Sequence, residues 1–179
     1  MKILIIYGTI EGHTEKVAHF LESELKNQGH ESALFNTAER TSAISFQGID
    51  KVILAASVHE RRHPQTFEVF LTGHSEEISS RPCMLISVSL SAAHTEGEEE
   101  AMEYVEEMLM RTGLNPDKTL CVGGAIKLSK YDFYALQVLR HVVLRGKEFD
   151  ASKNEHEFTD WDKLSAVASS FIKGTAGGA

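Results

Sequence analysis

Apolar residues in this chain gather in short runs, separated by segments with helical periodicity. The runs at 2–8, 51–57 and 82–87 are apolar without alternation, which is typical of parallel strands buried on both faces. A similar run lies at 120–124, and the more polar residues 31–36 suit a strand at the edge of a sheet. The pattern therefore predicts five strands.

Helices are expected between these strands. Val17, Leu21 and Leu25 recur every four residues within 14–28, and Gly29 marks the end of that helix. A second helix follows Pro64, because proline suits the first helical turn. Strands that alternate with helices form a parallel sheet through right-handed crossovers. We therefore expect an α/β fold, a doubly wound five-stranded parallel sheet, for which 2-1-3-4-5 is a common strand order.

Two later helices complete the pattern. The first of them is expected to carry Met102, Val105, Leu109 and Thr112 on the face that packs against the sheet. The last helix is expected to begin with Thr159 as its N-cap, since an acidic residue follows three positions later.

The turn after the first strand carries the candidate chemistry. Thr9 and Thr14 place two hydroxyls around Gly12, which allows the backbone to approach a ligand closely. The next helix offers unbonded N–H groups and partial positive charge, so a phosphate is the expected ligand. No lysine follows Gly12 as in a P-loop, so the turn suits a monophosphate held without a metal. The alternative is an ordinary βα turn with Thr14 as N-cap.

Further loops leave the carboxyl ends of strands that the predicted order brings together. Ligands of such sheets bind in the crevice beyond these ends. The predicted cofactor-binding residues are Thr9, Ile10, Glu11, Gly12, His13, Thr14, Ser57, Val58, His59, Ser87, Val88, Ser89, Leu90, Gly123, Gly124 and Ala125.

Length and composition narrow the class of protein. The 179 residues fit a single domain, placed at 1–173 with a disordered tail at 174–179. Apolar content of 42% and charged content of 25% are ordinary for a globular chain, and no apolar run approaches the ~20 residues of a membrane span. Without a signal peptide, a cytoplasmic location is expected. A net charge of −8 argues against nucleic-acid binding.

Neither cysteine indicates a metal site or a disulfide. Cys83 and Cys121 both lie in or beside apolar runs, where a free thiol behaves as a small hydrophobic group. They form no C-x-x-C pair and have no histidine at a ligand spacing. The sequence therefore predicts that the protein binds no metal ion.

A long insertion lies at about 125–158, far beyond the usual length of a βα loop. Within it, residues 131–145 predict a helix that is apolar over more than one stripe. Five basic residues against two acidic ones give the segment 127–148 a charge of +3. This favours peripheral contact with an anionic membrane, on the inner face of the cell membrane, through about 127–147. A homodimer contact or an extra core layer are equal alternatives.

Together these motifs resemble a known family. The turn at 9–14 resembles the phosphate loop of flavodoxins, which holds the 5′-phosphate of FMN. Over nearly its whole length the chain resembles the menaquinone-dependent protoporphyrinogen IX dehydrogenases, on the ordered series Thr9-x-Glu-Gly-x-Thr14, Ala56-Ser57-Val58, Ser87-Val88-Ser89-Leu90, Gly123-Gly124-Ala125, the insertion and Thr159-Asp160-Trp161. The resemblance implies a flavodoxin-like fold with the strand order 2-1-3-4-5, and bound FMN. It also implies oxidation of protoporphyrinogen IX in haem biosynthesis with a respiratory quinone as acceptor.

Two other functions share this pattern, a flavodoxin-type electron carrier and an NAD(P)H:quinone reductase. Arg61, Arg62 and His63 are predicted to bind substrate. They would make the rim of the flavin site cationic, which suits a substrate that bears carboxylates, whereas electron carriers present an acidic surface there. The alternative for the two arginines is a solvated loop pair. The loops expected to flank the flavin contain no tyrosine or tryptophan, which leaves His59, His63 or Leu90 as neighbours of the ring. The sequence assigns no catalytic acid or base.

Overall fold

The computed structural model of the chain describes residues 1–39, 44–127, 129 and 154–174. Five strands form one parallel sheet in the order β2-β1-β3-β4-β5, which confirms the prediction. β4 ends two residues later, and β5 begins two residues earlier, than the apolar runs indicated. The strands are β1 (Lys2–Gly8), β2 (Glu31–Asn36), β3 (Lys51–Ser57), β4 (Cys83–Ser89) and β5 (Lys118–Gly123).

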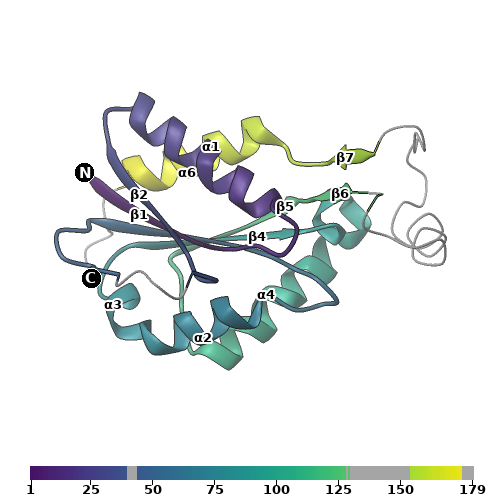
Figure 1. Cartoon of the computed structure of the whole chain (residues 1–179), viewed down its shortest axis with the longest axis horizontal. Coiled ribbons are helices and arrows are strands. Elements are labelled where there is room, and N and C mark those ends of the chain that lie inside the picture. The colour runs from purple at the N-terminus through teal and green to yellow at the C-terminus, as the bar shows by residue number, and fades with distance from the viewer. Residues whose placement is uncertain (40–43, 128, 130–153, 175–179) are drawn as a thin grey trace.

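Helices cover both faces of this sheet (Figure 1). One face carries α1 (His13–Asn27) and α6 (Trp161–Lys173). The opposite face carries α2 (Gln65–Gly73), α3 (Ser75–Ser79) and α4 (Glu98–Thr112). Two short 3₁₀ turns, Ser91–Ala93 and Thr95–Gly97, lead from β4 into α4.

The central strands supply two separate apolar cores, because successive side chains of a strand point to opposite faces. In β1, Ile3 and Ile5 belong to the core under α1 and α6. Leu4 and Ile6 belong to the core over α2 and α4. All four are at most 4% exposed, and burial of each such side chain contributes about 1.5–3 kcal/mol. A strand that is apolar at every position therefore needs a helical layer on both sides.

The ends of the predicted insertion pair with each other. β6 (Ala125–Lys127) and β7 (Glu155–Glu157) form an antiparallel ribbon in which Ile126 lies opposite His156. The ribbon lies beyond the carboxyl end of β5 and beside the start of α1 (Figure 1). The predicted helix at 131–145, most of the predicted membrane contact at 127–147 and the tail after residue 174 lie outside the described residues.

The buried face of α4 differs from the predicted one. Ala101, Tyr104, Val105, Met108 and Thr112 are buried, whereas the side chain predicted to begin the stripe, at position 102, is 40% exposed. The spacing of the buried residues is that of a single helical stripe, and small Ala101 is part of it. Val105 and Thr112 are buried as predicted, and Leu109 packs partly buried against the same core. The buried stripe also includes Ala101, Tyr104 and Met108, which the prediction left out.

The start of α6 also differs from its prediction. The N-cap is Asp160, whose Oδ1 accepts a hydrogen bond of 2.9 Å from the Lys163 amide. Thr159 instead donates its hydroxyl to the Gly123 carbonyl over 2.6 Å, so it ties the start of α6 to the end of β5.

Among the described residues, no helix is both long enough and apolar enough to cross a membrane.

Candidate functional site

A pocket opens beyond the carboxyl ends of β1, β3 and β4. The strand order reverses here, since β2 lies on one side of β1 and β3 on the other, and such switch points are where α/β sheets bind ligands. The lining residues come from the loops after these strands, from the residues after β5 and from α4. They are Thr9, Ile10, Glu11, His13, Thr14, Ser57, Val58, His59, Glu60, Arg61, Val88, Ser89, Leu90, Ser91, Tyr104, Gly124 and Ala125.

Three predicted cofactor residues lie outside this lining and shape the walls instead. Gly12 adopts a φ of 89°, a left-handed conformation that glycine reaches without strain. Ser87 is fully buried, with its hydroxyl 3.0 Å from a ring nitrogen of His63. At Gly123 a side chain would place its Cβ 2.5 Å from the Phe158 carbonyl oxygen, so glycine lets the chain returning to α6 pass close by.

The loop after β1 is organised by its own groups. The Gly12 amide donates to Thr9 Oγ1 over 2.9 Å, which closes the turn. α1 then begins at His13, with Gly12 as an N-cap that has no side chain to offer. The N–H groups of the first helical turn have no partner within the helix, and the helix dipole adds partial positive charge there. The loop is therefore suited to an anion.

Two hydroxyls in the pocket are buried and unpaired. Thr14 is fully buried within the first turn of α1, and its Oγ1 has no hydrogen-bond partner among the described residues. The same holds for the Ser57 hydroxyl, at the end of β3. An unsatisfied buried hydroxyl costs about 1–3 kcal/mol, and a ligand that accepts hydrogen bonds removes this cost. Thr14 is not the N-cap of α1, since the helix begins at His13 with Gly12 as its N-cap.

The loop after β3 contains a strained two-residue turn. His59 and Arg62 exchange backbone hydrogen bonds of 2.9 and 3.0 Å. Between them, Glu60 and Arg61 have φ angles of 49° and 65°, the double left-handed combination of a type I′ turn. Without glycine, each such residue costs about 1–2 kcal/mol. The neighbouring side chains of Arg61 and Arg62 reach different partners.

Arg61 is the arginine that lines the pocket. Its guanidinium lies 5.1 Å from the ring centroid of Tyr104 and forms ion pairs of 2.7 Å with Glu100 and 3.6 Å with Glu103. The side chain is 59% exposed, so these ion pairs are individually weak. Arg61 can therefore exchange a protein carboxylate for one on a ligand.

Arg62 belongs to a structural ion-pair network instead. It donates to Glu68 over 3.1 Å, and Arg111 donates to the same carboxylate over 2.8 and 3.1 Å. Burial alone would raise the pKa of Glu68, but the hydrogen bonds from Arg111 and Arg62 outweigh it and hold the pKa below its usual range. Arg62 thus helps to join the loop after β3 to α2 and α4.

His63 lies behind the pocket wall. It is 2% exposed, with Nε2 3.0 Å from the Ser87 hydroxyl. Burial lowers the pKa of its ring to about 4, so the imidazole is neutral near pH 7. The structure therefore brings Arg61 to the pocket, pairs the exposed Arg62 with Glu68 on α2, and buries His63 behind the pocket wall.

Sequence reasoning missed three lining residues, Glu60, Ser91 and Tyr104. Tyr104 is only 5% exposed and is the aromatic group that the loops themselves lack. It comes from α4, where its spacing of three residues from Ala101 was the signal that could have placed it on the buried face. Of the predicted flavin neighbours, His59 and Leu90 line the pocket.

The two cysteines make no site. Both are free, Cys83 is buried, and burial raises the pKa of its thiol to about 12. Burial also raises the pKa of Cys121. Neither forms a thiolate near neutral pH, as expected for cysteines that serve as small apolar groups.

Comparison with known proteins identifies the family and the fold of the chain. Residues 4–168 match the flavodoxin domain family. The protoporphyrinogen IX dehydrogenase [quinone] of Escherichia coli strain K12 is 28% identical over 94% of this chain and 93% of its own length. The protein of that name from Leishmania major is 23% identical over 95% of this chain and 74% of its own. Oxidised flavodoxin 1 from Bacillus cereus superposes with a TM-score of 0.56 at 15% identity, covering 98% of this chain and all of that one.

The buried His63 predicts a specific pH dependence of stability. Its folded-state pKa of about 4 lies below the ordinary value of 6.5, so the unfolded chain takes up the proton first as pH falls. Stability that is present above pH 6.5 is then lost as the pH falls from there toward 4. Between about pH 7 and pH 5, the parent should lose about 2 kcal/mol more unfolding free energy than His63→Gln.

Denaturant titration of both proteins at the two pH values measures this difference. His19→Gln, which changes an exposed histidine on α1, is the control and should keep the parent's pH dependence. Equal losses in the parent and in His63→Gln would contradict the assignment of His63 to the core.

Proposed function

Since this chain belongs to the flavodoxin domain family, we propose that it is an FMN-dependent enzyme that oxidises protoporphyrinogen IX to protoporphyrin IX and passes the electrons to a respiratory quinone. The observation that carries the proposal is the pairing of two facts. Relatives of that activity align over nearly the whole chain, and the pocket at the switch point holds buried hydroxyls that await an acceptor.

Membership in the family implies FMN as the cofactor, and the residues present fit it. The phosphate would be held by the loop 9–14, where Thr14 Oγ1 is buried and unpaired beside the first turn of α1. All of these donors are neutral, which matches a single phosphate rather than a metal-bound polyphosphate. When bound, FMN would supply the redox chemistry, and the protein would supply binding and orientation.

The remaining wall of the pocket would surround the flavin. Val58, Val88 and Leu90 offer apolar surface, and buried Tyr104 offers an aromatic ring. The backbone is braced where the loops meet, since the Val58 amide donates to the Val88 carbonyl over 2.7 Å. Such a wall excludes water from one side of a ligand and fixes its position.

A second function, an electron carrier of the flavodoxin type, is favoured by one observation. Glu100 and Glu103 form ion pairs with Arg61, and Glu60 also lines the pocket, so the rim is less cationic than the loop sequence suggested. Acidic rims suit contact with cationic redox partners. We place the enzyme first because the relatives that align with almost their full length carry that activity.

One experiment separates the candidate functions. The purified full-length protein is kept under anaerobic conditions, and flavin absorbance is followed after addition of protoporphyrinogen IX, NADH or NADPH. We expect rapid reduction by protoporphyrinogen IX and reoxidation by a menaquinone analogue. Reduction by NADH or NADPH alone would instead identify a nicotinamide-dependent quinone reductase, and reduction only by a protein donor would identify a carrier.

Thr14→Val tests the assignment of the phosphate loop. Valine keeps the shape but removes the hydroxyl, so FMN should bind about 5- to 30-fold more weakly, equivalent to about 1–2 kcal/mol. The flavin-free protein should become no less stable, because an unpaired buried hydroxyl has been removed. Fluorescence titration with FMN and thermal unfolding measure the two effects, with Thr14→Ser as the control that keeps the hydroxyl. Unchanged FMN affinity in Thr14→Val would remove Thr14 from the site.

Arg61→Gln tests the assignment of the substrate site. If Arg61 binds a substrate carboxylate, KM for protoporphyrinogen IX should rise about tenfold while FMN affinity stays within about twofold. Arg62→Gln is the matched control. Its guanidinium holds Glu68, so that variant should lower the melting temperature and leave KM unchanged. Equal KM values in both variants and the parent would contradict a role for Arg61 in binding.

Contact with a membrane surface remains part of the proposal for the quinone. The predicted segment, about 127–147, lies mostly outside the described residues, so the charge of +3 over 127–148 is the support for this contact. A homodimer through the same segment is the competing proposal.

A further inference from the structure

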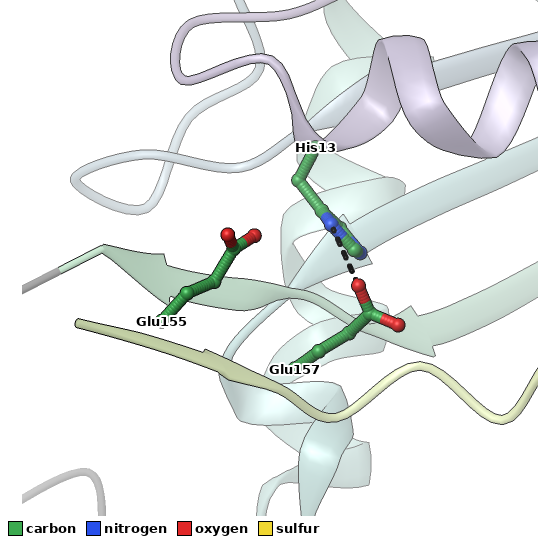
Figure 2. A group of neighbouring side chains, drawn as sticks. All are labelled: His13, Glu155 and Glu157. Carbon is green, nitrogen blue, oxygen red and sulfur yellow. Dashed lines mark ion pairs between the residues drawn. The ribbon is translucent and has the colours of Figure 1, made fainter. Parts of the chain in front are cut away.

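A group of metal-ligating side chains lies beside the phosphate loop. His13 begins α1, and Glu155 and Glu157 stand two residues apart on β7, which places both carboxylates on one face of that strand. Figure 2 shows the two glutamates rising from β7 toward the imidazole. One ligand atom from each residue lies within 4.8 Å of the others.

The hydrogen bonds around His13 determine which ring nitrogen carries the proton. Its Nε2 lies 2.7 Å from Thr159 Oγ1. Thr159 has one hydroxyl hydrogen, and that hydrogen is donated to the Gly123 carbonyl over 2.6 Å. The Thr159 oxygen must therefore accept from Nε2–H. In the neutral ring, Nδ1 is then left as an unprotonated lone pair.

Among the described residues, no hydrogen-bond donor reaches this buried lone pair. His13 is 7% exposed, and its Nδ1 has no hydrogen-bond partner among the described residues. The group that it faces is the Glu157 carboxylate at 3.8 Å, which is too long for a hydrogen bond. The dashed line in Figure 2 marks this ion pair. Burial, the largest influence, lowers the pKa of His13 below its usual range, even though Glu157 raises it. A lone pair that faces one carboxylate, with a second carboxylate within 4.8 Å, is an arrangement that a cation stabilises.

We propose that His13 Nδ1, Glu155 and Glu157 form a binding site for a divalent transition-metal cation of the Zn²⁺ type. One imidazole nitrogen with two carboxylates is a donor set that suits such cations, with water as a fourth ligand. Ligand atoms of tetrahedral Zn²⁺ lie about 3.4 Å apart at the usual bond lengths, so the side chains need to converge by about 1 Å. Glutamates on an exposed strand can move that far by rotating their side chains.

The surroundings of the group resemble the outer shell of a metal site. Metal-bound histidines usually donate their other ring N–H to an oxygen, and here Thr159 fills that place. Glu157 is oriented by Trp161, whose Nε1–H donates to Oε1 over 2.7 Å and leaves Oε2 facing His13. Both ligand-bearing elements are thus positioned before a cation arrives.

Two lysines oppose a dication at this place. Lys16 forms an ion pair with Glu157 Oε2, and its side chain is 58% exposed, so it can move into solvent at little cost. Lys127 donates to the Glu11 carbonyl over 3.2 Å, and its charge also disfavours a positive charge on His13. Lys16 is therefore the internal competitor for Glu157, and its removal should strengthen metal binding.

A cation here would join β7 to the start of α1. β7 ends the long insertion, and His13 belongs to the loop that carries Thr9 and Thr14. The site would therefore tie the insertion to the cofactor loop. This consequence does not depend on which substrate the pocket accepts.

The test uses the full-length protein with its native flavin content, treated with a chelator and then titrated with Zn²⁺ by calorimetry. We expect one saturable Zn²⁺ per chain, and binding at least about tenfold weaker in both Glu155→Gln and Glu157→Gln. Glutamine at 157 still accepts from Trp161, so the fold should persist. Lys16→Met should bind Zn²⁺ more tightly than the parent.

A matched control is available on the surface of α1. His19 and Glu22 also lie 3.8 Å apart, but His19 is 59% exposed and carries no orienting bond among the described contacts. Glu22→Gln should therefore leave Zn²⁺ affinity unchanged. In NMR spectra of nitrogen-labelled protein, Zn²⁺ should shift the Nδ1 resonance of His13, while Nε2 keeps its proton.

Three results would overturn the proposal: no saturable binding of one Zn²⁺ per chain, equal affinity in the parent and in both glutamine variants, or a Zn²⁺-induced shift on another histidine and none on His13. Each of these readouts is independent of FMN reduction and of the porphyrinogen assay, so a failure here does not bear on the proposed enzyme.

Discussion

Burial of both faces of the central strands is the constraint on which the rest of the structure depends. β1, β3 and β4 are apolar at successive positions, so each needs helices on both sides of the sheet. Crossover helices meet this need, and they force neighbouring strands to run parallel. Parallel strands in turn place their following loops at one edge. The pocket is therefore a geometric consequence of how the cores are covered.

Polar groups in that pocket are arranged at a cost to stability. Thr14 and Ser57 bury unpaired hydroxyls, and Glu60 and Arg61 occupy left-handed backbone conformations. Each feature costs free energy in the protein alone. The cost is offset elsewhere by well-paired groups such as Glu68 with its two arginines. Unsatisfied donors and local strain next to a fully satisfied network mark the pocket as the part of the molecule suited to ligand binding.

The same distinction applies to His13. Its Nε2 is hydrogen-bonded to Thr159, whereas its Nδ1 faces the Glu157 carboxylate without a hydrogen bond, with Glu155 nearby. His13 is also part of the phosphate loop, and it lies beside β7, the strand that ends the insertion. A cation at this position and a cofactor in the pocket would thus stabilise the same short segment from two sides.

How far the sequence alone determines this protein depends on the range of the interactions involved. The five strands and the phosphate loop follow from local patterns, because apolar periodicity and the Thr9–Gly12–Thr14 spacing are properties of neighbouring residues. The order of the strands came from the family resemblance, since no local pattern fixes which strands are neighbours. Contacts between distant residues had no such signal. Tyr104 reaches the pocket because α4 packs with Ala101 against the sheet. Arg62 is drawn away from the pocket because it pairs with the buried carboxylate of Glu68. His13 meets β7 across more than 140 positions of the chain. Only the tertiary packing decides these pairings, since they depend on which side chains the fold buries together.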